Sequence, residues 1–254
     1  MPRSSIRSAP TVLLVFCTVF FAASYFTVRF PDVPGAEVGS YVSTVIIALP
    51  ALGALLGSVG WGRGLAALAA VSLFAYGIEA LGVATGFPYG AFYYGDALGP
   101  RLFGLVPYLL PVTYVPLVVG AVAAAPGKGS VRRILLATLL LLLVDAVLDP
   151  GAASLGFWVW PDGGAYYGVP LSNYLGWALS GAVASALMLV LGRVENPLPG
   201  MVDSLLIAVA FWTGVAVFSS LIVPAILGLV VVLYLLRRRA VLVTRKASSV
   251  TRGV

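Results

Sequence analysis

The chain has 254 residues, of which 61% are hydrophobic and 9% are charged, and its formal net charge is +6. A soluble domain carries about 25% charged residues, so this composition excludes a soluble globular protein, and the high hydrophobicity excludes a disordered chain. The apolar runs are about 20 residues long rather than alternating segments of about 10, which predicts an all-α, polytopic bundle of transmembrane helices and not a β-barrel.

Two absences narrow the chemistry. The sequence contains no histidine, and its single cysteine is Cys17. Histidine-ligated metal and haem sites, Ser-His triads and disulfides within the chain are therefore excluded. Lysine occurs only as Lys128 and Lys246, at the edges of apolar runs, so a retinal Schiff base is not expected. We predict no metal and no other cofactor.

Seven apolar runs predict the transmembrane helices. They cover residues 9–28, 40–60, 65–85, 103–125, 134–150, 171–192 and 202–236. As one helix the last run would reach roughly 52 Å, far beyond a hydrocarbon core of about 30 Å, and Ser219, Ser220 and Pro224 offer a turn within it. We therefore expect about eight helices, with seven as the alternative. They form one domain over residues 1–240, followed by a short, poorly ordered basic tail over 241–254.

Basic residues fall almost entirely on one side of this arrangement. With eight helices, 13 of the 15 lysine and arginine residues lie at one membrane surface, and only Arg29 and Arg101 lie at the other. The positive-inside rule then places both termini in the cytoplasm and predicts a multi-pass protein of the cell membrane. This topology and contact with anionic lipids explain the net positive charge, so no nucleic-acid partner is expected.

Three carboxylic residues lie inside the predicted helices: Glu79, Asp145 and Asp149. Ionisable residues within a membrane are costly and by default indicate function. Glu79 lies 16 residues beyond Arg63, and Asp149 lies 16 residues beyond Arg133. Both are then about 24 Å from the cytoplasmic surface. The acids are therefore expected to converge in the outer half of the membrane.

The spacing of these acids favours a shared site. Asp145 and Asp149 are four residues apart and lie on one helix face, and Tyr76 is within reach of Glu79. A structural role is the alternative, in which each acid satisfies a helix end or pairs with Arg101 or a backbone amide. The proline that follows Asp149 favours this alternative there, because it predicts that the helix ends at that point.

The two outer loops that follow the acid-bearing helices are similar to each other. Both carry Tyr-Tyr-Gly after a stretch rich in aromatic residues and glycine, at residues 93–95 and 166–168. Such loops favour a folded cap over a cavity, and an aromatic belt at the membrane interface is the alternative. The predicted substrate-binding residues are Tyr76, Tyr89, Tyr93, Tyr94, Trp158, Tyr166, Tyr167, Asn173 and Trp177, although Trp177 alone is better explained by packing against core or lipid.

These motifs resemble a known family. The resemblance lies in residues 79–95 (EALGVATGFPYGAFYYG), 148–150 (LDP), 156–158 (GFW), 166–168 (YYG) and 170–177. The chain is similar there to the carotenoid-biosynthesis family of integral membrane proteins, which contains CruF-type carotenoid hydratases and bisanhydrobacterioruberin hydratases. The resemblance implies a hydratase, a carbon–oxygen lyase, that adds water to the terminal double bond of an acyclic carotenoid, for example converting bisanhydrobacterioruberin to bacterioruberin. Its implied partners are the carotenoid substrate, membrane lipids and other enzymes of the same pathway. The resemblance to this family does not assign a catalytic role to any residue of this chain.

The chemistry of hydration suits these residue types. An alkene is a very weak base, so the proton donor must be a protonated carboxyl group in a dry site. A second carboxylate can orient the water and accept its proton. We expect Asp145, the deeper acid, to donate the proton and Glu79 or Asp149 to handle the water. Aromatic faces that stabilise the carbocation are expected from Tyr89, Tyr93, Trp158 and Tyr166.

Two other functions stay open at this point. Asp145 and Asp149 form a D-x-x-x-D pattern, whose spacing can hold magnesium and a diphosphate in a membrane prenyltransferase. That function normally needs several cations, and Arg101 is the only outer-side cation near the site. A proton-coupled transporter or lipid-binding protein would use the three acids as a proton relay.

Overall fold

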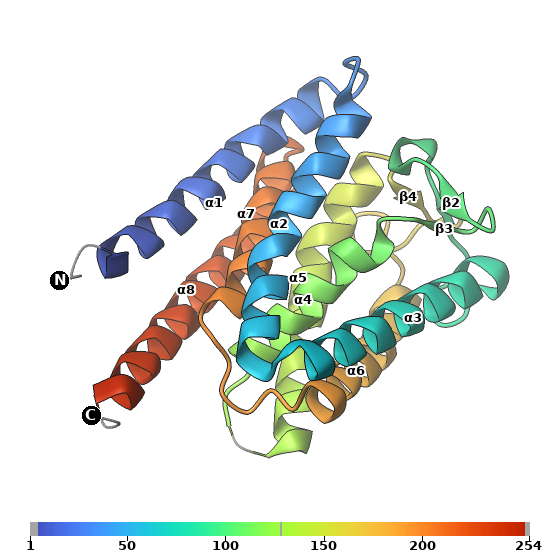
Figure 1. The fold of residues 1–254 in the computed structure, drawn as a ribbon. Coiled ribbons are helices and arrows are strands. Elements are labelled where there is room, and N and C mark those ends of the chain that lie inside the picture. Colours follow the sequence, from blue (N-terminus) through green and yellow to red (C-terminus); the bar gives the residue numbers. More distant parts are fainter. Residues whose placement is uncertain (1–4, 128, 252–254) are drawn as a thin grey trace.

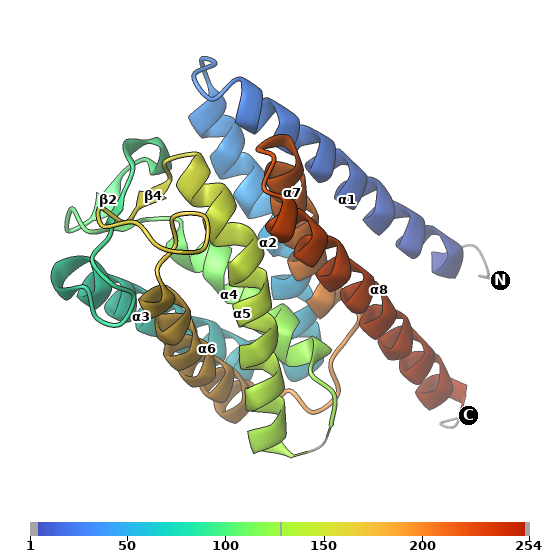
Figure 2. The ribbon, with the colours of Figure 1, turned by 180° about the vertical axis from the view of Figure 1, so that it is seen from behind.

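The protein is described by a computed structural model that covers residues 5–127 and 129–251. Within them lie the helices α1 (Ser5–Arg29), α2 (Ala36–Val59), α3 (Trp61–Thr85), α4 (Leu110–Ala124), α5 (Ser130–Ser154), α6 (Leu171–Gly192), α7 (Gly200–Phe218) and α8 (Ile222–Thr251). The loops hold a 3₁₀ turn, η1 (Asp96–Leu98), and four short strands, β1 (Tyr93–Tyr94), β2 (Arg101–Leu102), β3 (Val106–Pro107) and β4 (Trp158–Val159). The helices form a bundle and the labelled strands gather beside one end of it (Figures 1 and 2). The predicted all-α bundle is confirmed.

Five of the described helices are long and apolar enough to cross a membrane: α1, α2, α3, α6 and α7. Helix α4 is apolar but has only 15 residues, while α5 and α8 combine apolar stretches with several charged residues. The outer surface of the bundle is apolar, since Leu73, Val131 and Leu171 are each more than 70% exposed. Such side chains suit contact with lipid tails. The exact number of membrane passes stays a prediction.

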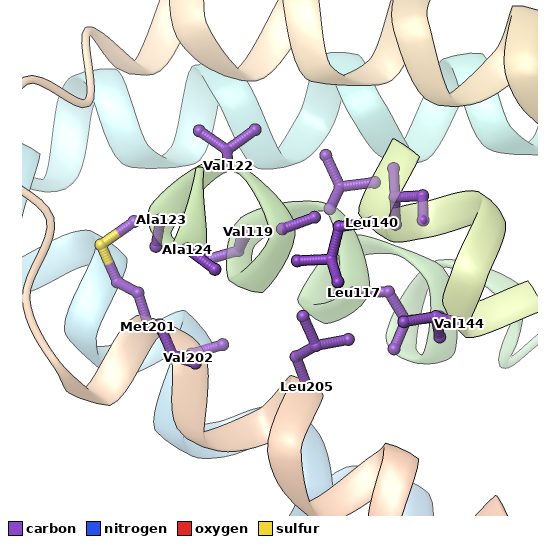
Figure 3. Packing of buried hydrophobic residues seen from close by; sticks show 14 of the residues in the cluster. Leu117, Val119, Val122, Ala123, Ala124, Leu140, Val144, Met201, Val202 and Leu205 are labelled. Carbon is purple, nitrogen blue, oxygen red and sulfur yellow. The ribbon is translucent and has the colours of Figure 1, made fainter. Parts of the chain in front are cut away.

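Helix α4 lies at the centre of the bundle. All of its residues from Tyr114 to Ala124 are buried, and it packs against α2, α3, α5, α6 and α7. Figure 3 shows its valines and alanines between Leu140 and Val144 of α5 and Val202 and Leu205 of α7. Gly120 permits this approach, because a Cβ there would lie 2.5 Å from the Cβ of Leu205. A central helix must be apolar on every face, which explains the absence of charge in this run.

The predicted start of the fourth helix is wrong. The apolar run begins at residue 103, but the helix begins at Leu110. The residues before it form a hairpin in which Arg101 pairs with Pro107 and Leu102 with Val106. Phe103 (φ 51°) and the glycine after it (φ 73°) have left-handed backbone conformations, which reverse the chain. Apolar composition alone could not distinguish this hairpin from a helical turn.

The predicted end of the fifth helix at Asp149 is also wrong. Helix α5 runs through Pro150 to Ser154. A proline inside a helix has no N–H for the carbonyl four residues earlier, which here is that of Ala146. The hydroxyl of Tyr166 donates a hydrogen bond to this carbonyl oxygen at 3.1 Å. A side chain from the following loop thus replaces the missing backbone donor, and Asp149 remains within the helix.

The predicted turn inside the last apolar run is confirmed, because α7 ends at Phe218 and α8 begins at Ile222. Ser220 has a positive φ of 59° in this turn. Helix α8 then continues to Thr251 and includes residues 241–251 of the expected basic tail. The end of its apolar part is held by an ion pair, in which Arg239 Nε lies 2.6 Å from Asp203 Oδ1.

The beginning of α1 and the end of α8 lie on the same side of the molecule (Figures 1 and 2). Arg133 donates hydrogen bonds to the carbonyl oxygens of Val122 and Val194, and Arg238 donates to that of Ala124. Arginines from α5 and α8 therefore gather around the end of α4, as the predicted grouping of basic residues requires. The side of the membrane that this end faces stays a prediction. Arg3, Lys128 and Arg252 of the predicted group lie outside the described residues.

Candidate active site

Two carboxyl groups of α5 meet one amide of α6. Asn173 Nδ2 donates to Asp145 Oδ2 at 3.1 Å and also to Asp149 Oδ2. All three side chains are buried, with exposed fractions of 0% for Asp145, 2% for Asp149 and 3% for Asn173. A single neutral nitrogen therefore bridges two buried carboxyl groups. The sequence predicted Asn173 as a lining residue, and the structure places it between the two acids.

Local sequence explains this arrangement. The four-residue spacing places both aspartates on one face of α5, and Asn173 lies in the first turn of α6, just after Pro170 opens that helix. The indole of Trp158 lies close enough to Asp149 to interact with its carboxyl group. The amide of Asn173 thus contacts both carboxyl groups, and the indole of Trp158 adds an interaction with Asp149.

Glu79, the third membrane acid, contacts the first of the two aromatic loops. Its side chain is buried on α3, and Tyr94 Oη donates a hydrogen bond to Glu79 Oε2 at 2.7 Å. Burial, and next the charge of Glu79, raise the pKa of Tyr94 well above its usual value. The phenol therefore keeps its proton and remains a donor to the carboxyl group.

The two loops join above the acids. Strand β1 pairs with β4 in antiparallel register, so that Tyr94 lies opposite Trp158, and Gly95 N donates to Phe157 O at 2.8 Å. Tyr94 contacts Glu79 and Trp158 contacts Asp149, so the pairing links the two carboxyl sites. Glu79 also interacts electrostatically with Asp149. The expected convergence of the acids from α3 and α5 is what the structure displays.

Tyr89 is held between two helices. A Cβ at Gly82 of α3 would lie 2.8 Å from Tyr89 Cδ2, and a Cβ at Gly176 of α6 would lie 2.4 Å from Tyr89 Cδ1. The ring therefore fills a slot that exists because both positions are glycine. Its hydroxyl faces Glu79 and Ser180. The carbonyl of Tyr89 accepts a hydrogen bond from Ser172 Oγ at 3.2 Å.

Replacing Gly176 with alanine is expected to destabilise the protein by about 1–3 kcal/mol, as overpacking does in other cores. The added methyl group would meet the Tyr89 ring and the backbone oxygen of Pro88 at 3.0 Å. The measurement is the thermal unfolding midpoint in detergent. Gly77→Ala on α3 is the matched control, since nothing lies within 4 Å of its Cβ position. Equal midpoints for the two variants would contradict the slot.

Further aromatic rings complete a layer over the acids. Phe92 packs against Tyr89, Tyr94 and Trp160 with ring centroids 5.4–6.2 Å apart. Trp158 packs against Tyr94 at 6.3 Å. We call Tyr89, Phe92, Tyr94, Trp158 and Trp160 the aromatic layer. These rings come from both loops, which agrees better with a folded cap than with a belt of independent interfacial residues.

Several predicted residues lie away from the acids. Tyr93 is 51% exposed, because neighbours in a strand point to opposite faces and Tyr94 points inward. The hydroxyl of Tyr76 donates to Tyr108 O at 2.6 Å, so it does not serve Glu79. Tyr167 is also exposed, and its hydroxyl accepts from Val223 N at 3.3 Å.

Two more predicted residues have packing roles. Tyr166 bonds to the carbonyl of Ala146, as described above, and supports α5 rather than facing the acids directly. The ring of Trp177 packs against that of Tyr114 with centroids 5.5 Å apart, which matches the core-packing alternative for this residue.

Sequence reasoning missed Tyr114, whereas Ser180 shares one face of the sixth predicted helix with Asn173 and Trp177 and was expected to line the same cavity. Both are buried, on α4 and α6 respectively, and Tyr114 interacts electrostatically with Glu79 and Asp145. A tyrosine inside an otherwise apolar run was the available signal, because a buried phenol normally needs a partner.

Arg101 does not pair with the membrane acids. Its Nη2 lies 2.9 Å from Asp96 Oδ1 in the loop, so the alternative in which it neutralises a buried carboxylate is wrong. Within the described part of the chain, no three histidine, cysteine, aspartate or glutamate groups lie close enough together to hold a metal ion. A polar hollow of about 270 Å³ lies elsewhere, at the other ends of α3 and α6, and includes Arg63 and Arg193.

The fold and the site together define a class: a helical membrane protein with buried carboxyl groups beneath a layer of aromatic loops. Residues 35–235 match the family described as carotenoid biosynthesis protein. The chain belongs to this family. It is 40% identical over 193 residues to a bisanhydrobacterioruberin hydratase from Haloarcula japonica.

This alignment covers 71% of the chain and 65% of the relative, so the chain matches just under two thirds of the relative's length. The matched family region contains all three membrane acids, Asn173 and the aromatic layer. No solved structure matches the chain.

Proposed function

We propose that this protein is a carotenoid hydratase that adds water across the terminal carbon–carbon double bond of an acyclic carotenoid end group. The observation that carries the proposal is the buried Asp145–Asn173–Asp149 cluster beneath the aromatic layer. The relative's name points to bisanhydrobacterioruberin or a similar acyclic carotenoid as the substrate. Such a substrate dissolves in the membrane, and the proposed location is the cell membrane.

The reaction has two steps. A carboxyl O–H transfers its proton to one alkene carbon, and the π electrons form the new C–H bond, which leaves a tertiary carbocation. A water oxygen then bonds to the cation and loses a proton to a carboxylate. One water molecule is added and no electrons are transferred, so the reaction balances without a redox cofactor.

The Asp145–Asn173–Asp149 cluster suits proton donation to the alkene, because ionising both of its carboxyl groups at once has a high free-energy cost. Each is almost fully buried, and the two share one neutral donor, Asn173. Burying two like charges together is strongly unfavourable, so one proton is retained between them. We assign this proton to Asp145, the more buried acid, with Asp149 as its charged partner beside Trp158.

Glu79 suits the second step. It lies on α3, apart from the aspartate pair on α5, and the Tyr94 hydroxyl donates a hydrogen bond to one of its carboxyl oxygens. A carboxylate in that position can accept the proton that the attacking water loses. Rings of the aromatic layer can stabilise the cation by about 0.5–2 kcal/mol each, and Tyr94 and Trp158 of this layer interact with Glu79 and Asp149.

The test is expression in a host that accumulates an acyclic carotenoid, followed by mass spectrometry of the pigments. We expect a more polar product whose mass is increased by one water per hydrated end. An empty vector is the control. An unchanged pigment profile with good membrane expression would contradict the proposal. A magnesium requirement with diphosphate release would support the prenyltransferase instead, and solute uptake would support a transporter.

A further inference from the structure

Several buried polar atoms in the described chain have no hydrogen-bond partner, and besides Tyr174 Oη, which lies near both aspartates, three of them lie near the acids. They are Tyr114 Oη on α4, Asp145 Oδ1 on α5 and Ser180 Oγ on α6. Their side chains are 5%, 0% and 0% exposed, respectively. Buried polar groups are nearly always paired, because an unpaired buried group has lost its hydrogen bonds to water without a replacement. Three such atoms on helices that pack against one another call for a common explanation.

The three side chains share one neighbourhood. Tyr114 interacts electrostatically with both Glu79 and Asp145, and its hydroxyl lies beside that of Ser180. Ser180 also lies beside the hydroxyl of Tyr89. These hydroxyl groups are close together, yet Tyr114 and Ser180 form no hydrogen bond of normal length and angle with each other. The Tyr114 hydroxyl therefore lies within electrostatic range of the carboxyl groups of both α3 and α5.

The oxygen of Asp145 that has no hydrogen-bond partner is the one that can carry the proton to be donated. Asp145 Oδ2 accepts from Asn173, whereas Oδ1 has no protein donor or acceptor. A carboxyl group that accepts through one oxygen can carry its proton on the other. On this assignment Oδ1 is the oxygen that carries the proton for the alkene.

We propose that Tyr114 and Ser180 bind the water molecule that adds to the carbocation, on the Glu79 side of Asp145. This inference rests on the proposed hydratase function. A bound water needs two to four polar partners, and two hydroxyls that donate and accept, together with a carboxylate, satisfy that need. Trp177 packs against the ring of Tyr114 and fixes its position.

The carbocation can react in two ways, by capturing water or by losing a proton, and a water-binding site should favour the first. When water is correctly held, it captures the cation and yields the alcohol. When water is not held, the cation loses a proton from a neighbouring carbon: that C–H bond breaks, its electrons re-form a double bond, and the proton returns to a carboxylate. In D₂O the carboxyl group delivers a deuteron to the alkene in the first step, and loss of a proton from the cation then leaves that deuterium in the recovered alkene. Loss of water binding therefore lowers alcohol formation while deuterium incorporation persists.

The experiment uses the full-length protein in liposomes with an acyclic carotenoid in D₂O, and mass spectrometry of both alcohol and recovered alkene. We expect Tyr114→Phe and Ser180→Ala each to lower alcohol formation about tenfold, the effect of losing about 1.4 kcal/mol. Deuterium in the recovered alkene should stay at or above the wild-type level. Ser185→Ala is the matched control, because Ser185 is a fully buried, unpartnered hydroxyl farther along α6.

Each outcome decides between the proposals. Alcohol and deuterium falling together in both variants, or alcohol unchanged in both, would overturn the water-binding role while leaving the hydratase function in place. If Tyr114→Phe does not fold, Ser180→Ala carries the test alone. If the wild-type protein forms neither alcohol nor deuterated alkene, the hydratase function itself fails, and the water-binding role fails with it.

Discussion

Asp145→Asn is expected to lower hydration by about 10²–10⁴-fold, the usual contribution of a general acid. Asparagine has nearly the same shape, and its side-chain oxygen can still accept from Asn173 as Asp145 Oδ2 does. It has no acidic proton to give to an alkene. The loss should therefore appear in product formation and in deuterium incorporation alike. Membrane expression and the thermal midpoint should be close to those of the wild-type protein.

Two further variants sharpen this test. Asp149→Asn should retain more activity than Asp145→Asn, because it removes the charged partner and not the assigned donor. Asp162→Asn, an exposed carboxylate in the second loop, is the control and should have no effect. Full turnover by Asp145→Asn would reject its role as donor, and loss confined to Asp149→Asn would exchange the two roles.

The sequence predicted the helices well where apolar runs are long and bounded by polar residues. The sixth run, 171–192, coincides with α6, and the turn at Ser219 and Ser220 divides α7 from α8 as expected. The prediction failed where a tertiary contact outweighed a local sequence rule, here the rule that proline ends a helix. Pro150 lies inside α5 because Tyr166, distant in the chain, satisfies the carbonyl that proline leaves free.

The membrane acids were recognisable from the sequence alone, because a carboxyl group within an apolar run is costly. Their partners were harder to predict. The bridging position of Asn173 depends on how α6 is rotated against α5, which spacing within one helix cannot specify. The slot for Tyr89 depends on Gly82 and Gly176, far apart in the chain and brought together only by the packing of α3 on α6.

The aromatic residues illustrate the same limit. The repeated Tyr-Tyr-Gly pattern drew attention to the correct loops, and those loops pair through β1 and β4. The pattern could not say which tyrosine of each pair points inward. Tyr94 reaches Glu79 while Tyr93 is exposed, and this choice is set by the register of the short strands.

Asn173→Leu is expected to be the second most damaging substitution, lowering both stability and activity. Leucine is similar in size but has no donor, so Asp145 and Asp149 would both lose the amide that they share. Leaving buried acceptors unpaired costs about 1–3 kcal/mol for each group. The thermal midpoint in detergent should fall clearly, and product formation should fall further than the loss of folded protein explains.

Asn173→Gln separates the hydrogen bond from simple packing. Its longer side chain keeps the amide donor, so it should restore part of both stability and hydration, whereas leucine restores neither. The comparison bears on how the cluster works, because an amide that bridges two acids stabilises whichever of them carries the negative charge. If Asn173→Leu kept the wild-type midpoint and turnover, the two aspartates would not depend on a shared donor, and the bridging role assigned to Asn173 would have to be abandoned.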